Sequence, residues 1–321
     1  MAVGIRASRE SQPRTAKSVL DAIGNTPLVY LRRLSPPGSH IYAKLEGLNP
    51  TGSVKDRPAL YMVEAAERRG ELHPGHELLE PTSGNTGLSL AMIARVKGYH
   101  LTVVAPDNVP EEKLEVLRLY GAKVMSSPGE EGSNGAIDVA RQVDIDGPQY
   151  WMLNQYSNPA NVEAHYQTTG LEILRDLPSI TAFVAGLGSG GTLMGISRRL
   201  KERDPSIDVI AAEPMAGEKV QGLRSLADGF VPPIFDPGSL DGRYLIEGEQ
   251  AIAMTQRLLD QEGIFAGPSA GAALVAALRY CSANPGGTVA VLLADAGWKY
   301  LSTGVFDAPT DKHGLEESML W

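Results

Sequence analysis

Lys55 is the residue whose type and position suggest covalent chemistry. It follows a short polar turn, Asn49–Ser53, and opens a predicted helix over Lys55–Gly70. The positive end of a helix dipole disfavours an ammonium group, so we expect a lowered pKa for Lys55 and a stronger amine nucleophile toward an aldehyde. On position alone, an ordinary first-turn lysine is the simpler interpretation.

A loop between a predicted strand and a predicted helix offers a site for a small anion. Its polar members are Thr82, Ser83, Asn85 and Thr86. Backbone N–H groups and hydroxyls at a helix N-terminus bind anions such as a carboxylate, and Asn85 can also donate to a cofactor oxygen. A capped helix without a ligand is the alternative, although a cap needs only one of these residues.

A second strand–helix loop is rich in glycine and has the form of a phosphate site. It contains Gly188, Ser189, Gly190, Gly191 and Thr192. Glycines let a phosphate approach the backbone, and the two hydroxyls add donors. The lysine of a P-loop is missing, and a tight structural turn is the alternative. Ser269 precedes an alanine-rich helix, where its simplest role is the N-cap.

Strands and helices alternate in two series around these loops. The first series has strands Tyr42–Glu46, Glu77–Pro81, Leu101–Ala105 and Ala122–Ser126 and helices Lys55–Gly70, Gly84–Gly98, Glu111–Tyr120 and Asn134–Asp144. The second has strands Ile180–Ala185, Ile207–Glu213 and Thr288–Ala294 and helices Gly190–Glu202, Glu249–Glu262 and Ala270–Cys281. Such an alternation predicts an α/β fold with mostly parallel sheets covered on both faces, in two lobes with a cleft between them.

The composition of the chain excludes several classes of binding partner and of structural site. The net charge of -9 argues against nucleic acid and anionic membranes. The single cysteine, Cys281, allows no intramolecular disulfide and is expected to be a buried core residue. No histidine recurs at a metal-ligand spacing, so no metal site is predicted. Residues 1–17 read as a disordered arm rather than a secretory signal, and we expect a cytoplasmic protein.

Together, these motifs resemble those of the cysteine synthases, which belong to the fold-type-II pyridoxal-phosphate (PLP) enzymes. The resemblance rests on Asn49–Arg57, Thr82–Gly87, Gly188–Thr192 and Ser269, with Gly24–Leu28, Asn154–Tyr156 and Tyr300–Gly304. It covers roughly residues 18 to 306. It implies a tryptophan synthase β-like fold, with a smaller α/β domain over 46–152 and a larger PLP-binding domain formed by 18–45 and 153–304.

The resemblance also implies a role for each site residue. Lys55 holds pyridoxal 5'-phosphate as a Schiff base and moves the Cα proton. The Gly188–Thr192 loop holds the cofactor phosphate, Asn85 contacts the 3-hydroxyl, and Ser269 faces the pyridine nitrogen. The substrate carboxylate is held by Thr82, Ser83, Asn85, Thr86 and Gln155. The implied reaction is a transferase β-replacement on an activated serine, through an α-aminoacrylate, that gives L-cysteine.

Within this family, one bacterial branch is the most similar, the O-phosphoserine sulfhydrylases. The similarity lies in Gly217–Arg224, Asp228–Pro232 and Asp295–Tyr300. It implies that Arg224 contacts the substrate phosphate, because a guanidinium fork matches phosphate oxygens. It also implies a thiocarboxylated carrier protein or sulfide as the sulfur donor, a homodimer, and a C-terminal tail over 305–321 that can fold over the site.

Three alternatives remain open at this point. The first is an O-acetylserine sulfhydrylase, in which Arg224 would have no role. The second is another β-eliminating PLP enzyme, such as a serine or threonine dehydratase. The third is a PLP-binding protein without turnover that docks a partner's C-terminus, although the presence of Lys55, Gln155 and the Thr82–Gly87 loop argues against it.

Overall fold

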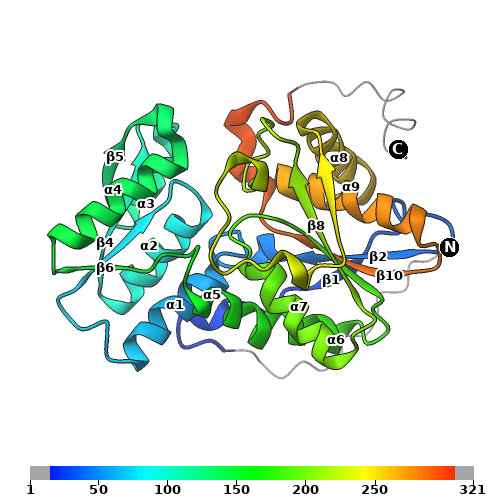
Figure 1. Ribbon diagram of the computed structural model, residues 1–321, viewed down its shortest axis with the longest axis horizontal. Helices are drawn as coiled ribbons and strands as arrows, with labels where there is room; N and C mark the ends of the chain where they lie inside the picture. The colour runs from blue at the N-terminus through cyan, green and yellow to red at the C-terminus, as the bar shows by residue number, and fades with distance from the viewer. Residues whose placement is uncertain (1–14, 308–321) are drawn as a thin grey trace.

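The computed structural model describes residues 15–307. Most of the predicted N-terminal arm and the C-terminal segment from residue 308 lie outside the described residues. The described chain forms two sheets, each with its own helices, and the two sheets lie side by side (Figure 1). Within residues 15–307, no helix has the length and apolarity needed to cross a lipid bilayer.

The smaller sheet has four parallel strands in the order β5-β4-β3-β6. These are β3 (Glu77–Pro81), β4 (His100–Pro106), β5 (Lys123–Ser127) and β6 (Tyr150–Met152). Its helices are α1 (Asp56–Arg68), α2 (Asn85–Lys97), α3 (Glu111–Leu119) and α4 (Gly132–Asp146). Neighbouring residues of β4 belong to hydrophobic clusters on opposite faces of the sheet. Val103 packs with α1 and α2, whereas Val104 packs with α4. The sheet is therefore covered on both faces.

The larger sheet has six strands in the order β1-β2-β10-β7-β8-β9, of which only β1 runs antiparallel to its neighbour. These are β1 (Leu28–Tyr30), β2 (His40–Leu45), β7 (Ala182–Gly186), β8 (Asp208–Pro214), β9 (Gly242–Ile246) and β10 (Thr288–Leu293). Helices α8 (Gly248–Glu262) and α9 (Pro268–Ala283) cover one face, and α6 (Gly170–Asp176) and α7 (Gly191–Arg203) cover the other (Figure 1). Helix α5 (Pro159–Ala164) precedes them and packs against α1 and α7.

The predicted α/β class with mostly parallel sheets is confirmed, and the predicted helices and strands agree with the structure to within a few residues at each end. Three short strands, β1, β6 and β9, were not predicted, nor was the helical stretch from α5 to α6. A five-residue π-helix, His165–Thr169, joins those two helices, so the stretch lacks a regular 3.6-residue period.

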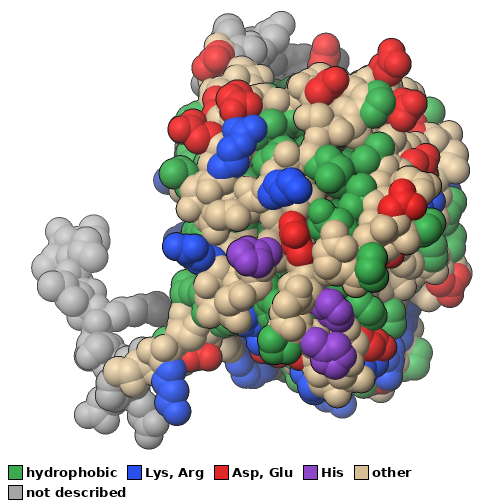
Figure 2. Space-filling model, turned by 90° about the vertical axis from the view of Figure 1, so that its left-hand side faces the viewer, with side chains coloured by type: hydrophobic (Ala, Val, Ile, Leu, Met, Phe, Trp, Pro, Cys, Tyr) green, Lys and Arg blue, Asp and Glu red, His purple; other side chains and the backbone are tan. Residues whose placement is uncertain are grey.

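Cys281 lies in α9 and is buried, as expected. Figure 2 shows the face of the molecule on the side of the smaller sheet. Acidic, basic and apolar side chains are interspersed over the described part of this face, which is the pattern of an ordinary solvated surface.

Candidate active site

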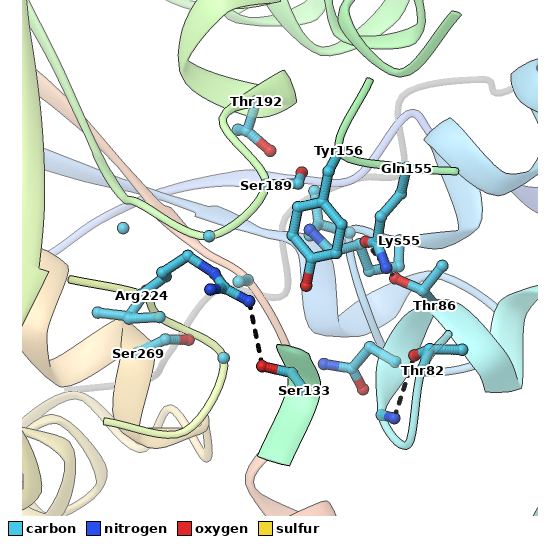
Figure 3. Close-up of a pocket in the computed structure, with 18 of the residues that line it drawn as sticks. Lys55, Thr82, Thr86, Ser133, Gln155, Tyr156, Ser189, Thr192, Arg224 and Ser269 are labelled. Carbon is cyan, nitrogen blue, oxygen red and sulfur yellow. Dashed lines mark hydrogen bonds between the residues drawn. The ribbon is translucent and has the colours of Figure 1, made fainter. Parts of the chain in front are cut away.

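A cavity of about 330 Å³ lies between the two sheets, at the carboxyl ends of strands β3, β7 and β10 (Figure 3). Ligands of open parallel sheets bind at such edges, where loops lead into helix N-termini. The predicted site residues that line this cavity are Lys55, Thr82, Ser83, Asn85, Thr86, Gln155, Gly188, Ser189, Gly190, Thr192, Arg224 and Ser269. Gly191 is the one predicted residue that does not line it, although it lies between two that do.

Lys55 is the N-cap residue of α1, with its side chain partly buried at the cavity wall. Burial lowers the pKa of Lys55, and the nearby carboxylate of Asp295 opposes this shift. The predicted direction of the shift is therefore confirmed, with removal from water as its main cause. A lysine amine with a lowered pKa is a better nucleophile toward an aldehyde.

The loop before α2 leaves the start of that helix without a side-chain cap. Gly84 is the N-cap residue, and it provides no side-chain cap. Oγ1 of Thr82 accepts from the N–H of Gly84 at 3.3 Å, and Oγ of Ser89 donates to the carbonyl of Asn85 at 2.9 Å. The hydroxyl of Thr86 instead donates to Oε1 of Gln155 at 2.8 Å. The hydroxyls of this loop therefore do not cap α2, and its N-terminus can receive an anion.

Gln155 is held in place by a buried carboxylate. Glu80 accepts hydrogen bonds from the backbone N–H groups of Asn154, at 2.7 Å, and Gln155, at 3.1 Å. Burial raises the pKa of Glu80 to about 7, although these bonds oppose the shift. Asn154 has a φ of 52°, an unusual value for a residue other than glycine. Glu80 thus stabilises a strained turn that places Gln155 opposite Thr86.

The glycine-rich loop before α7 has no room for larger residues at Gly188, Gly190 or Gly191. A Cβ on Gly188 would lie 2.9 Å from the carbonyl oxygen of Gly222, and one on Gly191 would lie 2.0 Å from Oδ1 of Asn161. Gly190 has a φ of 88°, which glycine adopts without strain. The loop thus lines the cavity at a helix N-terminus without bulky side chains, and this cradle fits a phosphate group.

His165 lies behind this loop and was not predicted from the sequence. Its Nε2 is 3.2 Å from the hydroxyl of Thr192, and its Nδ1 is 3.0 Å from the hydroxyl of Thr169. Burial and the positive charges of Arg57 and Lys55 hold the pKa of His165 well below its usual value. A neutral imidazole therefore contacts the phosphate loop. No motif marks this histidine, because its role comes only from tertiary contacts.

Ser269 is the second residue of α9, and its N-cap is Gly267. The simplest sequence interpretation, that Ser269 caps this helix, is therefore wrong. Its side chain is buried at the cavity wall, where its hydroxyl can meet a ligand.

Arg224 reaches across the mouth of the cavity to the N-terminus of α4. Its guanidinium lies 3.1 Å from Oγ of Ser133 and 3.3 Å from Oδ1 of Asn134 (Figure 3). Its Cζ atom lies 4.6 Å from the ring centroid of Phe230 and 5.3 Å from that of Tyr156. No ion pair found between residues 15 and 307 involves Arg224, although Asp228 also lines the cavity, so the guanidinium charge is available to a ligand.

Asp295 is a further cavity residue that was not predicted. It follows β10, and its Oδ2 accepts hydrogen bonds from the amide of Asn85 and the hydroxyl of Tyr300, both at 2.6 Å. Its Oδ1 is buried and has no hydrogen-bond partner. Burial raises the pKa of Asp295. The carboxylate of Asp295 is thus hydrogen-bonded to Asn85 and lies near enough to Lys55 for its charge to affect the pKa of the lysine.

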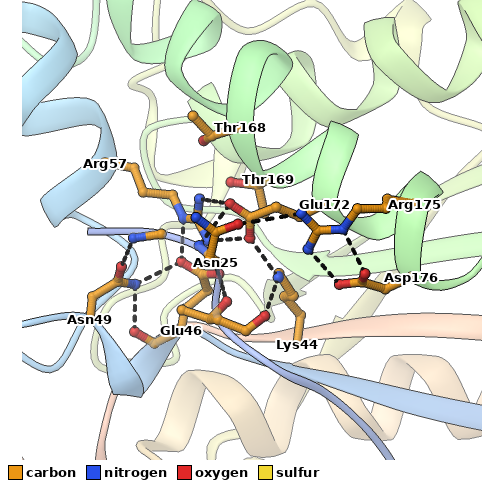
Figure 4. Close-up of polar contacts among 12 residues, drawn as sticks. Asn25, Lys44, Glu46, Asn49, Arg57, Thr168, Thr169, Glu172, Arg175 and Asp176 are labelled. Atoms are coloured by element: carbon orange, nitrogen blue, oxygen red, sulfur yellow. Dashed lines mark hydrogen bonds and ion pairs between the residues drawn. The ribbon is translucent and has the colours of Figure 1, made fainter. Parts of the chain in front are cut away.

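A buried ion-pair network lies two residues beyond Lys55 and ties α1 to the larger sheet (Figure 4). Arg57 binds Glu46, Nε to Oε2 at 2.7 Å, and Glu172, Nη1 to Oε1 at 2.7 Å. Lys44 pairs with the second oxygen of Glu172 at 2.7 Å. Two positive and two negative charges therefore balance, which buried charges require. Thr26, from the Gly24–Leu28 motif, also donates to Glu46.

A second cavity, of about 500 Å³, adjoins the first. The two share Ser83, Gly84, Asn85 and Gly222 in their walls. Within residues 15–307, no cluster of three or more side chains is arranged to hold a metal ion.

Comparison with known proteins agrees with this geometry. The family described as "Pyridoxal-phosphate dependent enzyme" matches residues 19–295. The chain is 45% identical to cysteine synthase B of Salmonella typhimurium, over 88% of this chain and 94% of that protein.

Solved structures extend the comparison. O-acetyl serine sulfhydrylase isoform 3 of Entamoeba histolytica superposes with a TM-score of 0.90 at 31% identity, covering 99% of both chains. A hydrogen sulfide-producing enzyme of Fusobacterium nucleatum has a TM-score of 0.85 at 38% identity, covering 89% of this chain and 100% of that one. The chain therefore belongs to the pyridoxal-phosphate-dependent enzymes of fold type II, the family that includes the cysteine synthases, and pyridoxal 5'-phosphate is its cofactor.

Proposed function

We propose that this protein is a cysteine synthase that replaces the β-substituent of O-phospho-L-serine with sulfur. The observation that carries the proposal is the convergence on one cavity of Lys55, the carboxylate loop, the glycine cradle and the Arg224 guanidinium, which has no ion-pair partner within residues 15–307. Together these four features would hold the cofactor, the substrate carboxylate and a phosphate on the β-carbon. The cysteine synthases and the sulfhydrylase among its relatives support the reaction class.

Each of the site residues has a separate role in the proposed reaction. When bound, the cofactor supplies an electron sink that labilises the Cα proton and the β-substituent of the amino acid. Lys55 holds the cofactor aldehyde, and its amine takes the proton from Cα and later returns it. The loop at the N-terminus of α2 binds the substrate carboxylate, together with Gln155. Ser269 is a neutral partner for the ring nitrogen, which suits β-elimination better than transamination.

Arg224 determines the substrate in this proposal. Its planar guanidinium matches two phosphate oxygens and gains little from a neutral acetyl ester. The N-terminus of α4, which carries Ser133 and Asn134, faces the same point from the smaller sheet. A phosphate held there would connect the two sheets over the cavity.

The test compares O-phosphoserine with O-acetylserine as substrates of the purified holoenzyme. We expect a higher kcat/KM for O-phosphoserine, and Arg224→Ala should lower that value about 10- to 100-fold, the effect of one charged hydrogen-bonding group. Arg141→Ala removes an exposed arginine of α4 and serves as the control. If O-acetylserine is preferred and Arg224→Ala changes nothing, the protein is an O-acetylserine sulfhydrylase.

A parallel measurement tests the reaction itself. Lys55→Ala should abolish the visible absorbance band of the bound cofactor and reduce cysteine formation at least 1000-fold, because the amine is both the attachment point and the base. Release of pyruvate from the wild-type enzyme without any need for a sulfur donor would identify a dehydratase instead.

The second cavity favours a donor larger than sulfide. Lys113, Trp298, Lys299 and Tyr300 contribute to its wall, so it combines apolar surface with two amines. We propose that the thiocarboxylated C-terminus of a small carrier protein enters through this cavity, with sulfide as the alternative donor. Lys113→Glu should then slow cysteine formation from a thiocarboxylated peptide and leave the rate with sulfide unchanged. The predicted tail contribution lies outside the described residues from 308 onward, and a homodimer stays a prediction that sedimentation can check.

A further inference from the structure

We propose that Asn161 is a positioning residue that couples the cofactor-phosphate loop to the segment that binds the substrate carboxylate. Neither the sequence motifs nor the lining of the cavity singles out this residue. The contact of Asn161 with the phosphate loop, the phosphate half of the coupling, affects only the binding of the cofactor. The substrate half rests on the proposed function, because it takes Thr86 and Gln155 as carboxylate ligands.

Asn161 lies between the two halves of the site. It is the third residue of α5 and only 1% exposed. Its Nδ2 donates to the backbone carbonyl of Gln155 at 2.8 Å and to the hydroxyl of Ser189 at 3.0 Å. Gln155 in turn accepts from Thr86 through its own side chain. One buried amide thus links the glycine loop before α7 to the loop before α2.

The orientation of this amide follows from its partners. A carbonyl oxygen only accepts, so the nitrogen of Asn161 must face Gln155. Oδ1 then points toward Gly191, where a Cβ would lie 2.0 Å away, and this buried oxygen has no hydrogen-bond partner. Gly191 is not among the positive-φ glycines, so close contact with Asn161, rather than backbone conformation, requires glycine there.

This arrangement directs the hydroxyl of Ser189. Because Ser189 accepts from Asn161, its own hydrogen is free to be donated to a phosphate oxygen in the cavity. The same amide fixes the backbone of Gln155 and thus the direction of its side chain. A change at Asn161 should therefore alter both cofactor affinity and substrate affinity.

The experiment starts from Asn161→Asp, which keeps the shape and removes both donors. Carboxylate oxygens would then face the carbonyl of Gln155 and the oxygen of Ser189. We expect the dissociation constant of pyridoxal 5'-phosphate, titrated into the apoenzyme, to rise about tenfold or more, and KM for the amino-acid substrate to rise about fivefold or more. Asn161→Ala, which introduces no charge, should show both effects more weakly and covers the case in which the aspartate variant fails to fold.

Two further variants, each on one side of Asn161, separate the effect on cofactor binding from the effect on substrate binding. Ser189→Ala should raise only the cofactor dissociation constant, and Thr86→Val should raise only KM. Asn158→Asp is the structural control, since Asn158 also lies at the start of α5 but caps the helix and bonds to Leu153, away from the cavity. It should change thermal stability without changing either affinity.

Wild-type cofactor affinity in both Asn161 variants, or the same behaviour as Asn158→Asp, would overturn the role of Asn161. If instead Thr86→Val leaves KM unchanged, the carboxylate assignment fails, and the substrate half of the coupling fails with it. A raised cofactor dissociation constant in Asn161→Asp would still support the phosphate half, so the two failures are distinguishable.

Discussion

Asp295 accepts a hydrogen bond from the side-chain amide of Asn85 at 2.6 Å, although the two residues are 210 positions apart in the chain. The bond crosses from the end of β10 in the larger sheet to the first residue of α2 beside the smaller sheet. It places a buried carboxylate beside Lys55, where the charge raises the pKa of the lysine against the effect of burial.

The first prediction concerns that charge. Asp295→Asn keeps an acceptor for Asn85 and removes the negative charge, so the pKa of Lys55 should fall further. Since only the neutral amine attacks an aldehyde, the pH midpoint for the rate of cofactor binding to the apoenzyme should move to lower pH. Stopped-flow absorbance measures this rate. Asp228→Asn, another cavity carboxylate, should leave the midpoint in place, and a midpoint that rises in Asp295→Asn would contradict the assignment.

The raised pKa of Glu80 predicts that the free energy of unfolding depends on pH. Its pKa in the folded protein is about 7 against an ordinary value of 4.5, so the folded state binds the proton more tightly than the unfolded state. The contribution of Glu80 to the free energy of unfolding should be complete below pH 4.5 and be lost as the pH rises through 7, by about 3 kcal/mol.

Glu80→Gln removes this titration and provides the comparison. Urea unfolding from pH 5 to 8 should show a smaller loss of stability with rising pH in the variant than in the wild type. The other titrating carboxyls are common to both proteins, so their contributions cancel in the difference. Parallel curves for the two proteins would show that Glu80 does not titrate in this range.

The buried network predicts the opposite dependence for Glu172. Arg57 and Lys44 outweigh the effect of burial and hold the pKa of Glu172 at about 2. Breaking a buried pair leaves an uncompensated charge, so Glu172→Gln should cost about 3–5 kcal/mol of unfolding free energy at pH 7.

That deficit should shrink as the pH falls from 4.5 through 2, because the wild-type carboxylate is then protonated as well. Chemical denaturation at several pH values measures it. Glu202→Gln, on the surface of α7, should show little change. An equal deficit at pH 7 and pH 2 would mean that shape, rather than charge, matters at position 172.

The aromatic rings around Arg224 predict a selective effect on one substrate. Phe230 packs against the guanidinium and should hold it in position before the phosphate arrives. Phe230→Leu should therefore raise KM for O-phosphoserine about three- to fivefold and leave KM for O-acetylserine unchanged. Steady-state kinetics with both substrates provides the measurement, and an equal rise for the two substrates would exclude this role.

Much of the site could be predicted because it consists of local motifs. Lys55, the Thr82–Thr86 loop and the glycine loop each lie where a strand gives way to a helix, and parallel strands bring such points to one edge. The alternation of strands and helices predicted two lobes with a cleft between them, and the resemblance to the cysteine synthases implied that these motifs form one cofactor site.

The residues that the sequence did not reveal act through distant contacts. His165 and Asn161 are single polar residues without a motif, and Asp295 begins the Asp295–Tyr300 segment without a role of its own in the prediction. Each meets its partner through the packing of other elements. The strands β1 and β6 were missed for a related reason. Each has only three residues, too few to show an alternating pattern, and depends on pairing with a longer neighbour.

The burial of Cys281 has a practical consequence. It is the only thiol in the chain, it is 2% exposed, and burial raises its pKa, so reagents that need an accessible thiolate will react slowly with it. A cysteine introduced at Ser133 or Leu301 would then be the single fast-reacting position. The wild-type protein is thus a ready background for attaching one spectroscopic probe at the mouth of either cavity and testing whether the surroundings of the probe change when an amino-acid substrate is added.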